Sequence, residues 1–238
     1  MPQHIPSTPQ YNRTQKYFLL TNTIVTIFWL FLLLRLAILY PLLSSRFLAS
    51  GIADFYLSIL IATIILENFN YIVIFRHIPG IQSINNSIPK PYLKNLIITS
   101  ISRLTLAFII FNYPKVTRSE SFPLIILIHS VKEFFRWFYN LQKVRLFNKI
   151  PNFNKLSRSI TYLLLTPLEI LTSIYIFFQS LIFTSYQINL IPYDYYIKSF
   201  LKFQILFYLP ISYTIYKRLI SKYFFAHNIN DNSNKKLE

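Results

Sequence analysis

The chain has 238 residues and a formal net charge of +16, and 53% of its residues are hydrophobic while only 13% are charged. A soluble domain of this length needs a charged surface that so few charges cannot cover, so the composition excludes an ordinary soluble protein and predicts one that spans a membrane several times. The absence of cysteine excludes disulfides, thiolate metal sites and a cysteine-based phosphatase mechanism.

Six apolar windows reach about 20 residues, the length that crosses a hydrocarbon core. The first is too long for a removable signal peptide and has no small-residue cleavage site after it, so we expect it to remain as an anchor. We therefore predict an all-α fold, a six-helix transmembrane bundle over residues 17–222, between an N-terminal tail at 1–16 and a polar C-terminal tail at 223–238. The windows cover residues 17–40, 51–75, 95–113, 121–141, 158–186 and 197–219.

The Lys and Arg residues between the windows predict the orientation of the bundle. Fifteen of them fall in the two tails and in the second and fourth connections, whereas three fall in the other connections. Because positive residues collect on the cytoplasmic side, we expect both termini in the cytosol. The basic residues alternate with apolar runs and form no stripe on a soluble fold, so we expect no nucleic-acid partner.

Several ionisable residues fall inside the windows, and each would cost about 2.5 to 3.5 kcal/mol at the bilayer centre without a partner. Three of them lie eight residues from a cytosolic helix end, a common depth of about 12 Å. This pattern predicts a polar cavity open to the cytosol, or else buried ion pairs that fix the register of the helices. The six residues are Glu67, Arg103 and Glu133, which share that depth, together with Lys132, Arg136 and Glu169. Glu133 and Arg136 are three apart and can meet, whereas Lys132 points to a different face.

The fifth window contains a candidate acid–base pair. Tyr162 and Glu169 are seven residues apart, so they lie on one helix face about 10 Å apart along the axis. Pro167 lies between them and should kink the helix. The carboxylate can act as a base and the phenol as an acid. The alternative interpretation is structural: a tyrosine near the membrane interface and an ion-paired glutamate.

These stretches resemble the very-long-chain (3R)-3-hydroxyacyl-CoA dehydratases, a family first labelled protein-tyrosine-phosphatase-like membrane proteins. The similarity runs from about residue 17 to about 222. Its most recognisable part is HSVKEFFRWFYN, residues 129–140, in which Glu133 and Arg136 are followed by aromatic residues. The other matches are Glu67 with Asn70, Ser102 with Arg103, FYLPISY in the last window, and Arg158 and Pro167 in the fifth window.

The resemblance implies a six-helix bundle in the endoplasmic reticulum membrane that removes water from a 3-hydroxyacyl-CoA, the third step of fatty-acid elongation. It implies no cofactor and no metal, an acyl-CoA substrate, surrounding membrane lipid, and other elongation-cycle enzymes as partners. The C-terminal KKLE, with Lys235 and Lys236, also looks like a dilysine retrieval signal, or else is a solvated charged tail.

The chain departs from the family at its catalytic positions. Anchored on Arg158 and Pro167, the expected Tyr and Glu fall on Thr166 and Ser173, which are poor substitutes for a phenol and a carboxylate. Either Tyr162 and Glu169, which keep the seven-residue spacing one turn earlier, have taken over the two roles, or the chain is a family member without dehydratase chemistry.

Two further roles follow under the dehydratase hypothesis. Arg136 or Arg103 would stabilise enolate charge on the thioester oxygen. The fourth connection and its flanks would meet the coenzyme A phosphates through Lys143, Arg145, Lys149, Lys155 and Arg158, unless these residues only set topology. The competing functions are a membrane scaffold or acyl-CoA-binding partner of the elongation enzymes, and a small transporter, which the lack of internal repeats argues against.

Overall fold

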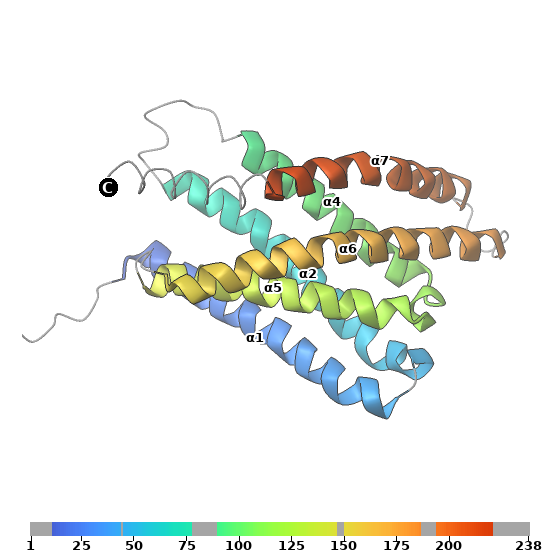
Figure 1. The fold of residues 1–238 in the computed structure, drawn as a ribbon, viewed down its shortest axis with the longest axis horizontal. Coiled ribbons are helices and arrows are strands. Elements are labelled where there is room, and N and C mark those ends of the chain that lie inside the picture. The colour runs from blue at the N-terminus through green and yellow to red at the C-terminus, as the bar shows by residue number, and fades with distance from the viewer. Residues whose placement is uncertain (1–10, 44, 78–89, 147–149, 187–193, 221–238) are drawn as a thin grey trace, which may run out of the picture.

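The computed structural model describes residues 11–43, 45–77, 90–146, 150–186 and 194–220. Over these residues the long elements are all α-helices, which confirms the predicted all-α class (Figure 1). A short 3-10 helix, η1 (Val116–Arg118), precedes α5. The six long helices are α1 (Arg13–Leu42), α2 (Ser45–His77), α4 (Lys90–Asn112), α5 (Ser121–Arg145), α6 (Asn152–Tyr186) and α7 (Asp194–Ile220).

Each predicted apolar window coincides with one of these helices, and most helices extend past their window by a few residues. α1 begins after Asn12, whose backbone N–H donates to the side chain of Gln15 at 3.0 Å. α6 is helical on both sides of Pro167, so the proline does not end the helix. Most of the second connection, between the windows 51–75 and 95–113, lies outside the described residues, as do most of the N-terminal tail and the C-terminal tail with Lys235 and Lys236.

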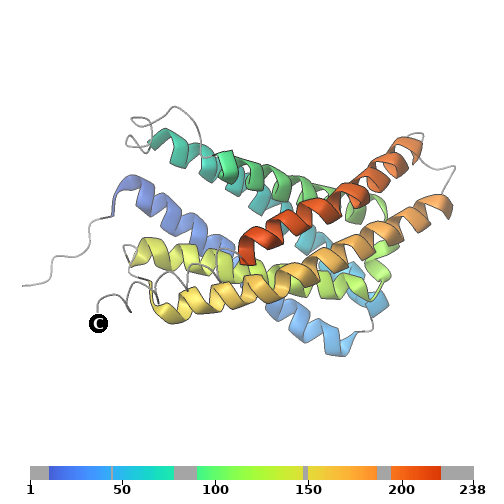
Figure 2. The same ribbon diagram turned by 45° about the horizontal axis from the view of Figure 1, so that its top comes forward.

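The helices run roughly along one long direction and pack as a chain of neighbours (Figures 1 and 2). α2 packs between α4 and α1, α1 packs on α5, and α5 packs on α6. α6 also contacts α4, which closes a ring of five helices. α7 packs on α6, and its Tyr208 hydroxyl accepts a hydrogen bond from Ser102 Oγ on α4 at 3.3 Å. The hydroxyl of Tyr17 on α1 donates to Asn70 Oδ1 on α2 at 2.9 Å, which ties the two helices near one end. The interior of this ring is where intramembrane polar residues can meet.

The core is a continuous apolar cluster contributed by all six helices. Close packing of these side chains stabilises the bundle through many small dispersion contacts. Trp29 and Tyr56 are its largest fully buried members, and their rings meet edge to face at 6.5 Å. Other members include Val25, Leu32, Ile52, Ile109, Ile125, Ile126, Phe177 and Leu201.

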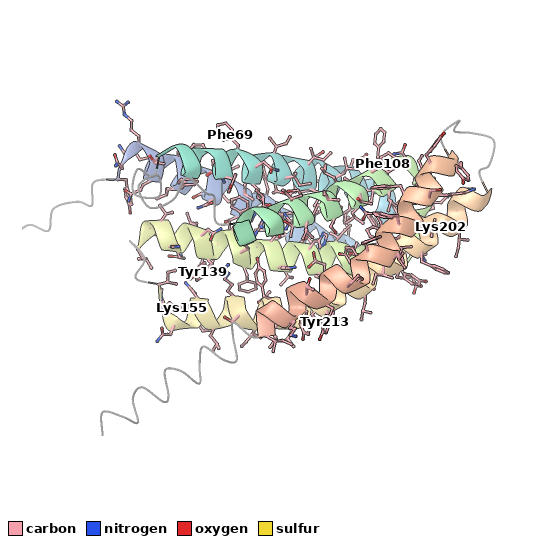
Figure 3. The ribbon with its side chains drawn as sticks, turned by 90° about the horizontal axis from the view of Figure 1, so that it is seen from above. Phe69, Phe108, Tyr139, Lys155, Lys202 and Tyr213 are labelled. Atoms are coloured by element: carbon pink, nitrogen blue, oxygen red, sulfur yellow. The ribbon has the colours of Figure 1, made fainter. Side chains whose placement is uncertain are left out.

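The outside of the bundle is apolar as well. Phe69, Phe108 and Tyr213 project outward from three different helices (Figure 3), and Phe111 is 78% exposed. Soluble proteins rarely expose so many large apolar side chains together. Several charged residues are buried instead, among them Arg103 and Glu133. Apolar side chains outside and charged side chains inside are the arrangement expected when lipid surrounds the bundle.

Within the part of the chain that the structure describes, three stretches of helix are long and apolar enough to cross a membrane: Arg13–Leu42, Gly51–Tyr71 and Asn152–Phe183. In α4 the apolar stretch Leu96–Asn112 is shorter. α5 and α7 carry charged residues along their length, such as Lys132, Glu133 and Arg136 in α5. The three spanning helices support the prediction of a membrane protein.

Candidate functional site

The site is built on one broad face of α5. At 100° per residue, Lys132, Arg136, His129, Glu133 and Trp137 occupy about 140° of this helix. α5 lies between α1 and α6 in the bundle (Figure 1), and His129, Glu133 and Trp137 are all buried. The charged stretch in the middle of an apolar helix therefore faces the interior, where other helices supply its partners.

Arg103 and Arg136 share two carboxylates in a buried network that joins α2, α4 and α5. Arg103 Nη1 lies 3.1 Å from Glu67 Oε1, and its Nη2 contacts Glu133 Oε1. Arg136 contacts the same two carboxylates, and Trp137 Nε1 donates to Glu133 Oε2 at 3.2 Å. The equal depths of Glu67, Arg103 and Glu133 predicted that they converge, and the three-residue spacing predicted the Glu133–Arg136 contact. Two acids and two bases alternate here, so the network is neutral.

A second polar cluster joins α5 to α6 through Glu169. The Oε2 atom of Glu169 contacts the ammonium of Lys132, and its Oε1 lies 3.0 Å from His129 Nε2. The other ring nitrogen of His129 lies 2.5 Å from the hydroxyl of Tyr56 on α2. Lys132 thus pairs across to α6, while its neighbour Glu133 pairs with α4, in agreement with the prediction that the two point to different faces.

Tyr162 lies on the same face of α6 as Glu169 and is linked to it through Lys132. The Lys132 ammonium lies 5.3 Å from the centre of the Tyr162 ring, and the Arg158 guanidinium lies 5.6 Å from it. Arg158 also stacks over Tyr139 at 4.2 Å. Cations placed over aromatic faces are attracted by the ring quadrupole, so Tyr162 sits in a positively charged setting. Among the described residues, Lys132 is the one whose side chain contacts both Tyr162 and Glu169.

Thr166 and Ser173, where the resemblance implies a Tyr and a Glu, lie on this face too. At 100° per residue, Arg158, Tyr162, Thr166, Glu169 and Ser173 fall within about 80° of α6. Thr166 and Ser173 are buried, with 5% and 3% of their surface exposed. The Thr166 hydroxyl has no hydrogen-bond partner within the described part of the chain. This face of α6 therefore contains Tyr162 and Glu169 together with Thr166 and Ser173, the positions from which the pair would have shifted.

The basic residues predicted to meet coenzyme A gather where α5 ends and α6 begins. Lys143, Arg145 and Lys155 are exposed, and Arg158 is half-buried. Figure 3 shows Tyr139 and Lys155 at the same end of the bundle. Lys149 lies outside the described residues. A cluster of positive charge thus leads from the surface toward Arg158 and Tyr162.

The described residues also form an apolar groove. Its volume is about 520 Å³, and it lies between α6 and α7. Leu163, Leu164 and Pro167, which line it from α6, lie about 100° to 200° around the helix from Tyr162. Tyr216 and Ile220 line it from α7. The groove therefore opens on a different face from Glu169, and the ionic side chains contact one another directly.

Two residues of the site were missed by reasoning from the sequence. His129 begins the quoted stretch and lies one turn before Glu133, which was a usable signal. Tyr56 offered no signal, because it is one of 18 tyrosines and its role depends on how α2 packs against α5. Within the residues described, no three His, Cys, Asp or Glu side chains come together in a way that could hold a metal ion.

Comparison with models of protein families, with curated proteins and with solved structures gives no match for this chain. Its function is therefore inferred from the chemistry of the site and from the residues that carry the resemblance described above.

Proposed function

We propose that all six helices cross the endoplasmic reticulum membrane, with both termini in the cytosol. The distribution of Lys and Arg supports this orientation. The charges of α5 are no obstacle to spanning, because Lys132, Glu133 and Arg136 each have a partner of opposite charge inside the bundle. Pairing removes most of the cost of placing them at membrane depth.

We further propose that the chain dehydrates a very-long-chain (3R)-3-hydroxyacyl-CoA to the trans-2-enoyl-CoA. The observation that carries this proposal is the meeting of Tyr162, Lys132 and Glu169 between α5 and α6. An acid, a base and a cation in one interior site are the groups that removal of water next to a thioester needs.

In the proposed reaction, the Glu169 carboxylate takes the proton from C2, and the electron pair of the broken C–H bond moves onto the thioester oxygen as an enolate. The enolate then re-forms the thioester carbonyl and the C2=C3 double bond as the C3–O bond breaks. Tyr162 gives its proton to the departing hydroxyl, which leaves as water. Glu169 then returns its proton to the Tyr162 phenolate, so the protein is unchanged at the end of the cycle. The substrate loses one water molecule, and no oxidant or reductant is needed.

In this scheme, Lys132 stabilises the enolate. Arg103 and Arg136, the candidates from the sequence, are both engaged by Glu67 and Glu133. Lys132 contacts Glu169 and faces Tyr162, so its ammonium is the nearest cation to the proposed reacting atoms. Preorganised charge of this kind commonly lowers a barrier by several kcal/mol, about 2.7 to 4 for one oxyanion donor.

A scaffold or acyl-CoA-binding partner of the elongation enzymes is the second candidate. It is favoured by Thr166 and Ser173 at the family's catalytic positions and by the occupation of both oxygens of Glu169. A protein of this kind would bind acyl-CoA through the same basic end and the same bundle but transfer no proton.

The deciding experiment incubates the purified full-length chain with a long-chain 3-hydroxyacyl-CoA and follows enoyl-CoA by mass spectrometry. Acyl-CoA binding is measured on the same preparation. Binding with turnover supports the dehydratase, and binding without turnover by folded protein replaces it with the scaffold.

A further inference from the structure

A hydrogen-bonded chain runs from Glu169 into the core of the bundle across three helices. Glu169 Oε1 on α6 lies 3.0 Å from His129 Nε2 on α5, and His129 Nδ1 lies 2.5 Å from the Tyr56 hydroxyl on α2. Tyr56 has no exposed surface, and His129 is 5% exposed. A carboxylate, an imidazole and a phenol are thus connected in a fixed order, away from the groups that face Tyr162.

The donors in this chain can be assigned from its surroundings. A neutral imidazole has one donor and one acceptor nitrogen. The Glu169 carboxylate only accepts, so Nε2 carries the proton and donates to it. Nδ1 is then the acceptor, and the Tyr56 hydroxyl donates to it. The neutral form fits the charge balance, because Glu67, Glu133 and Glu169 already face Arg103, Arg136 and Lys132. A charged His129 would add a cation with no acid of its own.

The chain ends in apolar packing, so it is suited to holding Glu169 rather than to moving protons. The Tyr56 ring is packed edge to face by Trp29 at 6.5 Å and by Phe122 at 6.3 Å. All three side chains are almost completely buried. His129 is therefore fixed at Nδ1 by a residue that is itself immobilised in the core.

The two oxygens of Glu169 consequently differ. Oε1 is held by a ring fixed between two helices, whereas Oε2 is held by the long, flexible side chain of Lys132. Lys132 can swing toward a substrate oxygen and leave Oε2 free, while Oε1 keeps its donor.

We propose that His129, braced by Tyr56, is a positioning residue that orients Glu169 so that its Oε2 is the atom that takes the substrate proton. This inference rests on the proposed dehydratase function. His129 touches no reacting atom in this scheme and acts only through Glu169.

The kinetic test compares variants of the full-length chain. His129→Leu should lower kcat about tenfold or more, with KM changed less than about twofold, because a hydrogen bond to a charged group is lost. His129→Gln should recover part of the loss, since its amide N–H can replace Nε2–H, and Tyr56→Phe should lower kcat about threefold. Ser180→Ala is the matched control, since Ser180 is fully buried on α6 and bonds only to Phe177 O, at 2.6 Å, among the hydrogen bonds of the described chain.

Unchanged kcat in folded His129→Leu, or equal losses in the Leu and Gln variants, would overturn the proposal. If His129→Leu does not fold, Tyr56→Phe decides, because it removes one hydroxyl and keeps the ring. An unchanged kcat in that variant would also overturn the proposal.

A second readout does not depend on activity. The infrared difference between wild type and Glu169→Gln assigns the carboxylate band of Glu169. That band should move in His129→Leu and in Tyr56→Phe and stay in place in Ser180→Ala. If wild type turns over substrate but the Glu169 band does not move in the His129 and Tyr56 variants, the positioning role alone is overturned. If the band moves but wild type shows no turnover, the proposed function is overturned, and the catalytic purpose of His129 with it.

Discussion

Arg103 is the cation that connects the most helices, because its guanidinium contacts Glu67 on α2 and Glu133 on α5 from its own place on α4. Its side chain is 9% exposed, so water cannot replace a lost partner. A planar guanidinium suits this role better than an ammonium, since its donors point to two carboxylates at once.

We expect Arg103→Met to lower the free energy of unfolding by about 3 to 5 kcal/mol, the usual cost of removing one partner from a buried ion pair. Arg103→Lys should lose less, because the charge remains. Arg35→Met is the control, since Arg35 is exposed on α1 and its guanidinium lies 5.4 Å from the Phe55 ring. Unfolding in mixed micelles measures all three, and equal losses for Arg103→Met and Arg35→Met would contradict the network.

Thr166 carries a buried hydroxyl that has no partner in the described chain, unlike Thr161, which donates to Ser157 O at 2.7 Å, and Thr172, which donates to Leu168 O at 2.8 Å. Replacing an unsatisfied hydroxyl by a methyl group of the same shape removes a cost of burial. We therefore expect Thr166→Val to leave stability unchanged or raise it by up to about 1 kcal/mol. A clear loss of thermal stability in Thr166→Val would mean that the hydroxyl has a partner.

At the scale of the helices, the sequence predicted where the elements lie and which polar residues share a depth. Apolar windows coincide with helices because length and hydropathy fix a spanning segment. The Glu133–Arg136 contact followed from spacing within one helix. The partners of Lys132 and His129 did not follow, because they depend on how α5 is rotated against α6 and α2, which one helix cannot specify. Buried ion pairs, one of the two expectations for the intramembrane charges, are what the described residues show, since the facing charges contact one another directly.

The contact between Lys132 and Glu169 is the main polar link from α5 to α6, and a double-mutant cycle measures it. Lys132→Met and Glu169→Gln should each destabilise the bundle by about 3 kcal/mol, since each leaves a buried group without its partner. The double variant should lose less than the two losses together, with a coupling of about 1 to 3 kcal/mol. Losses that simply add would show that the two side chains do not interact in the folded protein.

Across the whole molecule, the charged residues in the middle of the helices face the interior, while many large apolar side chains face outward. This arrangement explains how the chain accommodates the six charged residues deep in its helices: Glu67, Glu133 and Glu169 meet Arg103, Arg136 and Lys132. It also accounts for the lower hydropathy of α5, whose charged residues are stabilised by partners in the bundle rather than by the composition of the helix itself.

The proposed topology can be tested by cysteine labelling, because the chain has no cysteine of its own that would react with the label. Single cysteines are placed at the exposed positions Lys155 and Lys115, which lie at opposite ends of the bundle in the proposed orientation. In sealed microsomes, whose cytosolic face points outward, a maleimide that cannot cross membranes should label Lys155→Cys at once. Lys115→Cys should react only after permeabilisation, and the reverse pattern would invert the bundle.

The central claim is that Tyr162 and Glu169 perform the dehydration from one face of α6. The most direct measurement is turnover of a long-chain 3-hydroxyacyl-CoA by wild type, Tyr162→Phe, Glu169→Gln and Ser173→Ala. We predict a loss of about a hundredfold or more in the first two variants and a change of less than about threefold in Ser173→Ala. Turnover that survives in Glu169→Gln, or that disappears only in Ser173→Ala, would contradict the claim.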